Sequence, residues 1–356
     1  MSHRVRRVFP QPKEPPVFHA QPLRRCIVRL AVFTALVSLL SIGVAGVGPD
    51  EARAAESFQS WLAGVRKEAR GRGVSEATLD AALVGVKPIP RVIELDRRQP
   101  EFTLKFDEYL DRVVTQTRID KGRRLLQEHA TLLAEASTRH GVPPRFIVAL
   151  WGIETDFGRI TGGFPVIAAL ATLAHDGRRS AFFRRELMLA LEILDQGHIA
   201  PGAMQGSWAG AMGQSQFMPS SFHAFAIDHD GDGHKDIWTS LPDVFGSIAN
   251  YLSGSGWRND VTWGREVRLP EGFDTRVVES KTKKRLSEWQ ALGIRKVDGG
   301  DLPSRDLSAM IVMVTRKSGS PRYFLAYHNF DVILKWNRST YFALAVGTLA
   351  DALGTR

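Results

Sequence analysis

The stretch RFIVALWGIETDFGRITGG, residues 145–163, carries the pattern of a buried helix followed by a glycine-rich turn. Pro144 suits the first turn of a helix, where a missing backbone N–H costs nothing, and Gly158 suits its end. The sequence therefore predicts a helix over residues 144–157.

One face of this predicted helix is apolar but contains a carboxylate. Ile147, Leu150 and Trp151 recur at intervals of three and four residues, and the same spacing leads to Glu154. A glutamic acid on a buried face loses hydration when it ionises, which favours the protonated form that a general acid needs. The alternative is structural: Glu154 caps a backbone group or pairs with an arginine such as Arg159 or Arg179.

Helical patterns flank this stretch on both sides. Apolar residues at helical spacing begin at Phe58, and the prolines at 88 and 90 interrupt them, so residues 85–102 are predicted to form an extended connector. Further helices are predicted over residues 106–114, 122–140, 165–175, 180–195 and 339–353.

A region of alternating apolar and polar residues begins at about Trp257. Residues 261–270, 276–289 and 308–328 are predicted to form strands and turns, with a tight turn at Ser318-Gly319. The fold class is therefore α+β and mainly α: a helical body with a small β-rich insertion, after which the last helix returns to the body.

The N-terminus has the pattern of a secretory signal. A basic lead precedes residues 30–48, which carry no charge, and Ala52-Arg53-Ala54 fits the small-x-small rule for cleavage. An uncleaved membrane anchor is the alternative, because the apolar run approaches the length that spans a bilayer. Cys26 is the only cysteine and precedes the run, so we expect an exported protein that is not a lipoprotein. The mature chain would hold no disulfide, zinc-thiolate site or cysteine nucleophile.

The net charge of +9 does not point to nucleic acid. Residues 1–54 hold eight basic and three acidic residues, so the remainder has 39 basic and 35 acidic residues. No basic run interleaved with aromatic residues is present. We expect no nucleic-acid partner.

The segment GSWAGAMGQSQFMPSSF, residues 206–222, is too rich in small residues to build a core. Such a segment can form a close backbone wall against a ligand, with Gln214 and Gln216 to hydrogen-bond it, or it can be an irregular loop packed for its own sake. No phosphate-binding glycine pattern occurs in the chain. An ordinary glycosidase needs a second carboxylate, and Asp156, two residues along the helix, points away from Glu154.

The segment DHDGDGHKDIWT, residues 228–239, matches the first half of a calcium loop. Asp228, Asp230 and Asp232 stand at positions 1, 3 and 5, a glycine follows, and His234 stands where a backbone carbonyl serves as ligand. Position 12 lacks the usual glutamate, and Asp243 could close a lengthened loop. Three clustered carboxylates repel one another without a cation, so a structural Ca²⁺ is favoured over a solvated turn.

Six motifs together resemble the membrane-bound lytic transglycosylase B family, glycoside hydrolase family 103. They lie in the family's order between about Phe58 and Leu353: GIETDFG, ALATLAHDGRRSAFFRREL, GSWAGAMGQSQFMPSS, DHDGDGHKDIW, SIANYLSGSGW and KWNRSTYFALAV. The resemblance implies a lysozyme-like core with an α-domain, a small β-domain and an EF-hand calcium site. It also implies cleavage of the MurNAc–GlcNAc β-1,4 bond of peptidoglycan without water, which leaves a 1,6-anhydro-MurNAc end.

The resemblance assigns the site residue by residue. The family's single catalytic glutamate falls on Glu154, and the calcium ligands fall on Asp228, Asp230, Asp232, the carbonyl of His234 and Asp243. Its substrate-contacting residues fall on Ser207, Gln216, Tyr251, Asn337 and Arg179. Trp336 stands where the family has a tyrosine.

The sequence patterns and the resemblance together divide the chain. We expect a secretory signal over residues 1–54, an N-terminal α-domain over 55–125, a lysozyme-like core over 126–256, a β-rich subdomain over 257–328 and a C-terminal helix over 329–356. The expected protein is a periplasmic monomer that binds peptidoglycan glycan strands, attached to a membrane only if the signal is retained. Two alternatives remain at this point: a lysozyme-type hydrolase on the same scaffold, and a non-catalytic wall-binding protein.

Overall fold

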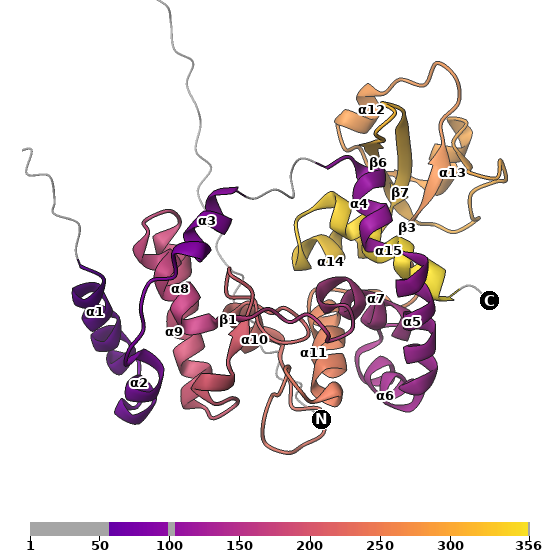
Figure 1. Ribbon diagram of the computed structural model, residues 1–356. Helices are drawn as coiled ribbons and strands as arrows, with labels where there is room; N and C mark the ends of the chain where they lie inside the picture. The colour runs from indigo at the N-terminus through magenta and orange to yellow at the C-terminus, as the bar shows by residue number, and fades with distance from the viewer. Residues whose placement is uncertain (1–56, 99–103, 355–356) are drawn as a thin grey trace, which may run out of the picture. The chain divides into compact units, whose positions relative to one another are not determined.

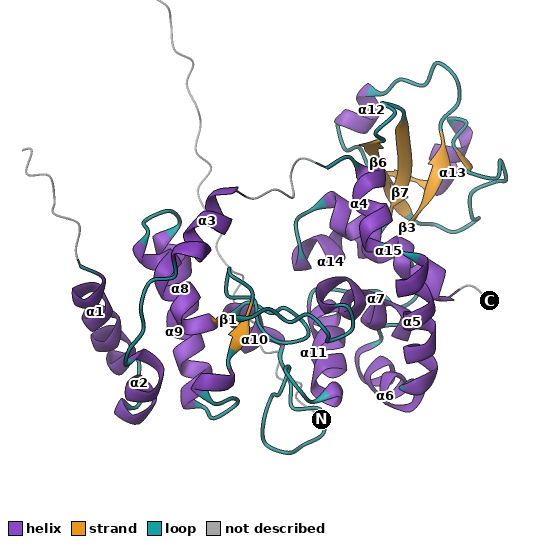
Figure 2. Ribbon diagram, in the orientation of Figure 1, coloured by secondary structure: helices purple, strands orange, loops and turns teal. Residues whose placement is uncertain are grey.

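The computed structural model describes residues 57–98 and 104–354. The predicted signal, residues 1–54, lies outside the described residues. Within the described ranges, no helix is long and apolar enough to cross a membrane. Figure 1 labels the elements along the chain, and Figure 2 shows that most of them are helices.

Three N-terminal helices, α1 (Phe58–Gly71), α2 (Glu76–Leu83) and α3 (Pro90–Arg98), pack against the pair α8 (Val166–His175) and α9 (Ser180–Asp195). The hydroxyls of Ser57 and Ser75 cap α1 and α2 by accepting backbone N–H groups of the first turn. The prediction of a helix over residues 180–195 is confirmed.

The extended connector predicted for residues 85–102 is wrong over half its length. Pro90 is the first residue of α3 instead of a residue that prevents a helix. The fixed φ and missing N–H of proline are tolerated in the first turn of a helix. The proline that interrupts the preceding helical pattern therefore begins a new helix. Val92 of α3 is buried.

A second set of helices leads into the segment that carries Glu154. The chain forms α4 (Phe106–Val113), α5 (Gln116–Glu128), α6 (Ala130–His140) and α7 (Pro144–Thr155). The prediction of one continuous helix over residues 122–140 is wrong, because the chain turns at His129, with φ −107° and ψ 24°. The imidazole of His129 packs against Trp151 and Phe245, a tertiary contact that no local pattern predicts.

Helix α7 lies at the centre of the helical body. It contacts α5, α6, α11 (Leu241–Gly254) and α15 (Thr340–Gly354). Two further short helices complete this part: α10 (Pro219–Phe225) and α14 (His328–Trp336). The helix predicted over residues 339–353 is confirmed as α15, which lies against α7 in Figure 1.

The β-rich region is an antiparallel sheet of five strands in the order β4-β6-β7-β3-β5. Its strands are β3 (Gly264–Arg268), β4 (Lys284–Arg285), β5 (Arg295–Lys296), β6 (Ser308–Thr315) and β7 (Pro321–Ala326). The predicted hairpin over 308–328 is confirmed: Ile311 pairs with Leu325, and Gly319 has the positive φ of 86° that the turn requires. Strands predicted over 276–289 are mostly wrong, since α12 (Arg276–Glu279) and α13 (Leu286–Ala291) occupy most of that range.

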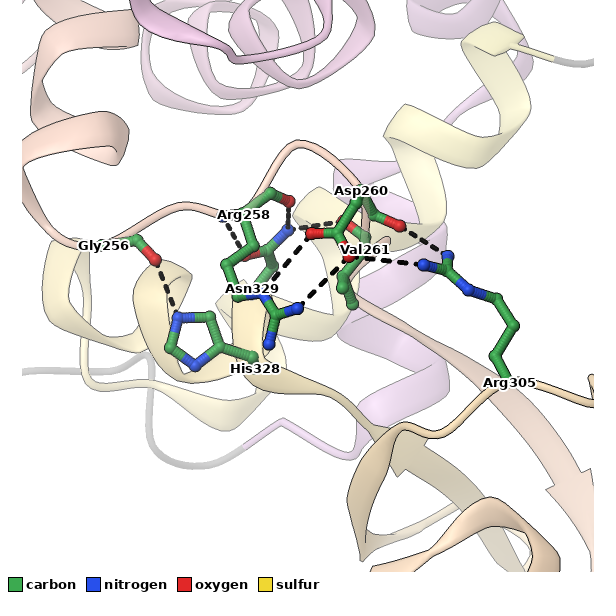
Figure 3. A network of polar contacts seen from close by, with 7 residues as sticks. All are labelled: Gly256, Arg258, Asp260, Val261, Arg305, His328 and Asn329. Carbon is green, nitrogen blue, oxygen red and sulfur yellow. Dashed lines mark hydrogen bonds and ion pairs between the residues drawn. The ribbon is translucent and has the colours of Figure 1, made fainter.

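Asn329 ties the sheet to the helical body. The side chain of this fully buried residue accepts the backbone N–H of Arg258 and donates to the carbonyl oxygens of Arg258 and Val261, at 2.9, 2.7 and 2.6 Å. Figure 3 shows this network between α14 and the loop that leads from α11 into β3. One amide thus satisfies three main-chain groups that would otherwise be buried without partners.

We expect Gly347→Ala to lower the free energy of unfolding by about 2 kcal/mol. A Cβ on this α15 residue would lie 2.2 Å from the indole of Trp263, which is itself buried, so the core must shift to admit it. Gly64→Ala in α1 is the matched control, because a Cβ there meets nothing within 4 Å and alanine favours a helix. Urea denaturation of the two variants measures the difference; equal stabilities would contradict the prediction.

Candidate active site

Glu154 lies in the last turn of α7, at the end of a buried face. Ile147 and Leu150 are fully buried and Trp151 is 3% exposed, as the apolar stripe predicts, whereas Glu154 is partly exposed. The carboxylate therefore sits where the buried face of α7 reaches the surface.

The chain turns away sharply after Glu154. Asp156, Phe157 and Gly158 all have left-handed backbone, with φ of 50°, 59° and 77°. The helix thus ends at Thr155, two residues before the predicted end at Phe157, and Asp156 is its C-cap. The Asp156 carboxylate accepts a hydrogen bond from Arg159 Nε at 2.6 Å.

The indole of Trp336, at the end of α14, contacts Glu154 directly. Its Nε1–H donates to Glu154 Oε1 at 2.7 Å. The two arginines considered as partners of Glu154 form other ion pairs: Arg159 with Asp156, and Arg179 with Asp96. The structure therefore pairs Glu154 with an aromatic residue that lies 182 positions further along the chain.

Tyr251 of α11 supports the position of Trp336. Their rings lie 4.6 Å apart, and the phenol donates to the carbonyl oxygen of Lys335 at 2.7 Å. Tyr251 is buried, and this burial raises the pKa of its phenol. Phe217, from the glycine-rich segment, contacts both rings.

The glycine-rich segment forms a close backbone contact just after α7, in agreement with its small residues. A Cβ on Gly162 would lie 2.1 Å from the carbonyl oxygen of Gly206, so only glycine fits. Beside this contact, β1 (Phe164–Pro165) pairs with β2 (Gln205–Gly206). The segment is thus pressed against the turn that follows Glu154.

Gln214 does not reach a ligand, which corrects the prediction for this amide. Its Oε1 accepts from Trp151 Nε1 at 2.8 Å, and its Nε2 donates to the carbonyl oxygen of Trp238 at 2.9 Å. The side chain is 9% exposed, so both polar atoms are used inside the protein. Gln214 links α7 to the acidic loop.

The two substrate residues predicted in this segment are both partly exposed. The hydroxyl of Ser207 accepts the backbone N–H of Ala211 at 3.0 Å. Gln216 has left-handed backbone, with φ of 50°, and its Nε2 donates to the carbonyl oxygens of Thr161 and Gly213.

Arg179 and Asn337 lie at two other helix ends. Arg179 has left-handed backbone before α9, and its guanidinium binds Asp96 at 2.5 Å, together with Arg178. Asp96 is 1% exposed; burial works to raise the pKa of its carboxyl, but the hydrogen bonds from Arg178 and Arg179 outweigh it, so that pKa lies below its usual value. Asn337 is exposed after α14, and its Oδ1 accepts the N–H of Ser339.

The structure brings three predicted metal ligands together. Carboxylate oxygens of Asp228, Asp230 and Asp232 lie within 4.8 Å of one another. The Asp228 carboxylate accepts backbone N–H groups of Gly231, Asp232 and Gly233, and these bonds, that of Gly233 foremost, lower its pKa. Ionised oxygens held in a turn of this kind match the ligands that Ca²⁺ prefers.

Asp243 and His234 lie beside this cluster. Asp243, in the first turn of α11, is fully buried and accepts the N–H groups of His229 and Asp236 at 2.6 and 2.7 Å. Burial raises the pKa of Asp243 to about 6. The backbone N–H of His234 donates to Asp232 Oδ1 at 2.8 Å. Asp243 is thus bonded to the ends of the loop, outside the group of three aspartates.

Sequence reasoning missed two features of this site. The indole N–H of Trp336 reaches Glu154, and Asp96 holds Arg179 from a segment expected to be extended. Neither contact leaves a local signal, because each joins residues more than 80 positions apart.

Residues 57–351 match the family described as transglycosylase SLT domain. The chain is 31% identical to membrane-bound lytic murein transglycosylase B from Escherichia coli over 308 residues, which cover 81% of each protein.

Solved structures agree with the sequence comparison. The structure of SltB3 from Pseudomonas aeruginosa in complex with NAG-anhNAM-pentapeptide is 44% identical, with a TM-score of 0.80 over 84% of this chain and 80% of that one. The Escherichia coli lytic transglycosylase SLT35 in complex with calcium is 29% identical, with a TM-score of 0.70 over 84% and 93% of the two chains. The helical fold with a small sheet is thus that of known lytic transglycosylase structures.

Proposed function

The chain belongs to the transglycosylase SLT domain family and is a lytic transglycosylase that acts on peptidoglycan, and from this premise we propose that Glu154 is its single acid/base catalyst. The observation that supports the role is the placement of this carboxylate: partly exposed, at the end of a buried helix face, with one oxygen bonded to Trp336. Asp156, the next carboxylate along the chain, is engaged by arginine.

In the first step, Glu154 donates its proton to the oxygen of the MurNAc–GlcNAc β-1,4 bond. The bond from that oxygen to C1 of MurNAc breaks, the N-acetyl group of the same sugar assists at C1, and the leaving GlcNAc carries the proton away. Glu154 is now ionised and serves as the base in the second step.

In the second step, the carboxylate of Glu154 removes the proton from the C6 hydroxyl of MurNAc. The C6 oxygen bonds to C1 and displaces the N-acetyl oxygen, which gives 1,6-anhydro-MurNAc and restores the protonated glutamic acid. No water enters the product, so one carboxyl group suffices, in contrast to an ordinary glycosidase.

We also propose that five residues bind the glycan strand and its stem peptide: Ser207, Gln216, Tyr251, Asn337 and Arg179. Ser207 and Gln216 are partly exposed and Asn337 is exposed, and their hydroxyl and amide groups suit sugar hydroxyl and acetamido groups. The ring of Tyr251 supports the site by packing against Trp336. Arg179, about half exposed beside Asp96, suits a carboxylate of a stem peptide.

We propose that Asp228, Asp230, Asp232, the carbonyl of His234 and Asp243 hold a structural Ca²⁺. The support is the cluster of three carboxylates and the calcium in the structure of SLT35. Each Asp243 oxygen accepts one N–H and keeps a second lone pair, and a cation would favour the ionised form that burial penalises.

The substrate lies outside the cytoplasmic membrane, which places the site of action there. More narrowly, we propose export to the periplasm by the N-terminal signal, without lipid attachment, and action as a monomer with no nucleic-acid partner. The position of Cys26 before the apolar run supports the absence of a lipid anchor.

Mass spectrometry of digested peptidoglycan tests the proposed reaction. We expect muropeptides whose MurNAc ends are 18 Da lighter than reducing ends, because an intramolecular ether replaces the added water. A digest that contains reducing MurNAc ends alone would instead establish a lysozyme-type hydrolase, and the absence of any product would favour a wall-binding protein.

A further inference from the structure

We propose that Trp336 is a positioning residue for the catalytic glutamate: its indole N–H fixes which oxygen of Glu154 carries the transferable proton. The inference rests on the proposed role of Glu154 and on the distance of 2.7 Å from Trp336 Nε1 to Glu154 Oε1. The family resemblance places a tyrosine at this position, and an indole differs from a phenol in its chemistry.

The indole nitrogen is a donor only, and it does not ionise in the range where enzymes work. The oxygen that accepts its hydrogen bond must offer a lone pair, and the carbonyl-type oxygen of a protonated carboxyl is the better acceptor. The proton of Glu154 is therefore favoured on Oε2. A phenol could accept as well as donate, so it would not impose this choice.

The indole is held in place before any substrate arrives. Its ring packs 4.6 Å from that of Tyr251 and 5.2 Å from that of Phe217. On its N-terminal side, Lys335 is fixed twice: its carbonyl oxygen accepts the phenol of Tyr251, and its Nζ donates to the carbonyl oxygen of Ser255. The donor is thus oriented by packing and by main-chain bonds, as a preorganised polar group requires.

The bond from Trp336 favours the first proton transfer through the acidity of Glu154, and, although it weakens Glu154 as a base, it favours the second through orientation. It is stronger to the ionised carboxylate than to the neutral acid, because the acceptor then carries charge. It therefore makes Glu154 a readier proton donor in the first step. It also holds the carboxylate in one orientation while that group acts as base.

Trp336→Phe tests the inference, since it keeps an aromatic ring and removes the N–H. We expect kcat to fall about tenfold with KM little changed. We also expect the alkaline limb of the pH–rate profile to move about one pH unit upward, because the free energy of a hydrogen bond to a charged group corresponds to a shift of about that size. An alkaline limb that stays in place in the folded variant would overturn the inference, whatever the change in rate.

A purely structural role is separated by a matched control. Trp289 is a buried tryptophan of α13 whose Nε1–H donates to the carbonyl oxygen of Ala309 at 2.9 Å. Trp289→Phe also removes an indole hydrogen bond, and it should lower the melting temperature without moving the pH–rate profile. A similar shift of the profile in both variants would contradict a specific role for Trp336.

A second variant covers the case in which Trp336→Phe does not fold. Site-specific incorporation of 3-benzothienylalanine at position 336 keeps the size of the indole and replaces only the N–H, and it should move the alkaline limb in the same direction.

Failure of the inference is distinct from failure of the proposed function. Lysis at an undiminished rate in Glu154→Gln would contradict the catalytic role of Glu154 itself, whereas a strongly impaired Glu154→Gln with an unmoved limb in the Trp336 variants contradicts only the inference.

Discussion

Glu154→Gln is expected to lower the rate of muropeptide release about a thousandfold or more, while the variant still binds peptidoglycan. Glutamine fills the same space and can accept the indole N–H of Trp336 at its amide oxygen, so the local packing is retained. It cannot donate or accept the transferred proton, and both steps of the proposed reaction depend on that proton. Release of soluble muropeptides measures the rate, and co-sedimentation with the polymer measures binding.

Asp156→Asn is the matched control for this experiment. Asp156 carries the next carboxylate, two residues along, and asparagine tolerates its left-handed backbone. We expect this variant to keep most of the activity. Equal losses in the two variants would mean that general damage to the end of α7, and not the loss of one acid, explains the effect.

Removal of calcium is expected to lower the free energy of unfolding by about 3 to 4 kcal/mol when the ion starts at several hundred times its dissociation constant. Asp228, Asp230 and Asp232 bring negative charge together in the folded loop, and a cation bound only by the folded state stabilises that state. Thermal unfolding with calcium, and again after chelation, measures the change.

Asp228→Asn should make the melting temperature insensitive to calcium. Asp298→Asn changes an exposed carboxylate in the turn after β5 and is the control that should keep the response. If the melting temperature of the unmodified protein does not respond to calcium after all bound metal has been removed, the proposed site is wrong.

Local patterns predicted the parts of this fold whose structure is itself local. The stripe of Ile147, Leu150 and Trp151 predicted a buried face because helical periodicity is a property of neighbouring residues. The hairpin at Gly319 and the clustering of the three aspartates followed for the same reason, since turn chemistry and loop spacing are encoded within a dozen residues. The candidate acid could therefore be identified before its surroundings were known.

Features that depend on distant contacts could not be predicted in this way. The break at His129 follows from the packing of its ring on Trp151 and Phe245, which belong to other helices. Gln214 looked available to a ligand but satisfies buried polar groups of Trp151 and Trp238. An amide or an indole can serve substrate or scaffold equally well, and only the tertiary structure decides between them.

Helix α11 links the acidic loop to the backbone beside Trp336, the hydrogen-bond donor to the proposed catalyst Glu154. Asp243, in its first turn, bonds the two ends of the loop, and Tyr251, about two turns further along, fixes the backbone beside Trp336. A cation that orders the start of this helix would thereby favour the arrangement in which Trp336 meets Glu154. Binding linkage is reciprocal. A glycan strand that selects the same arrangement would therefore raise the affinity for the cation by the same factor by which the cation raises the affinity for the glycan strand. The saccharide would then act as an effector of metal affinity.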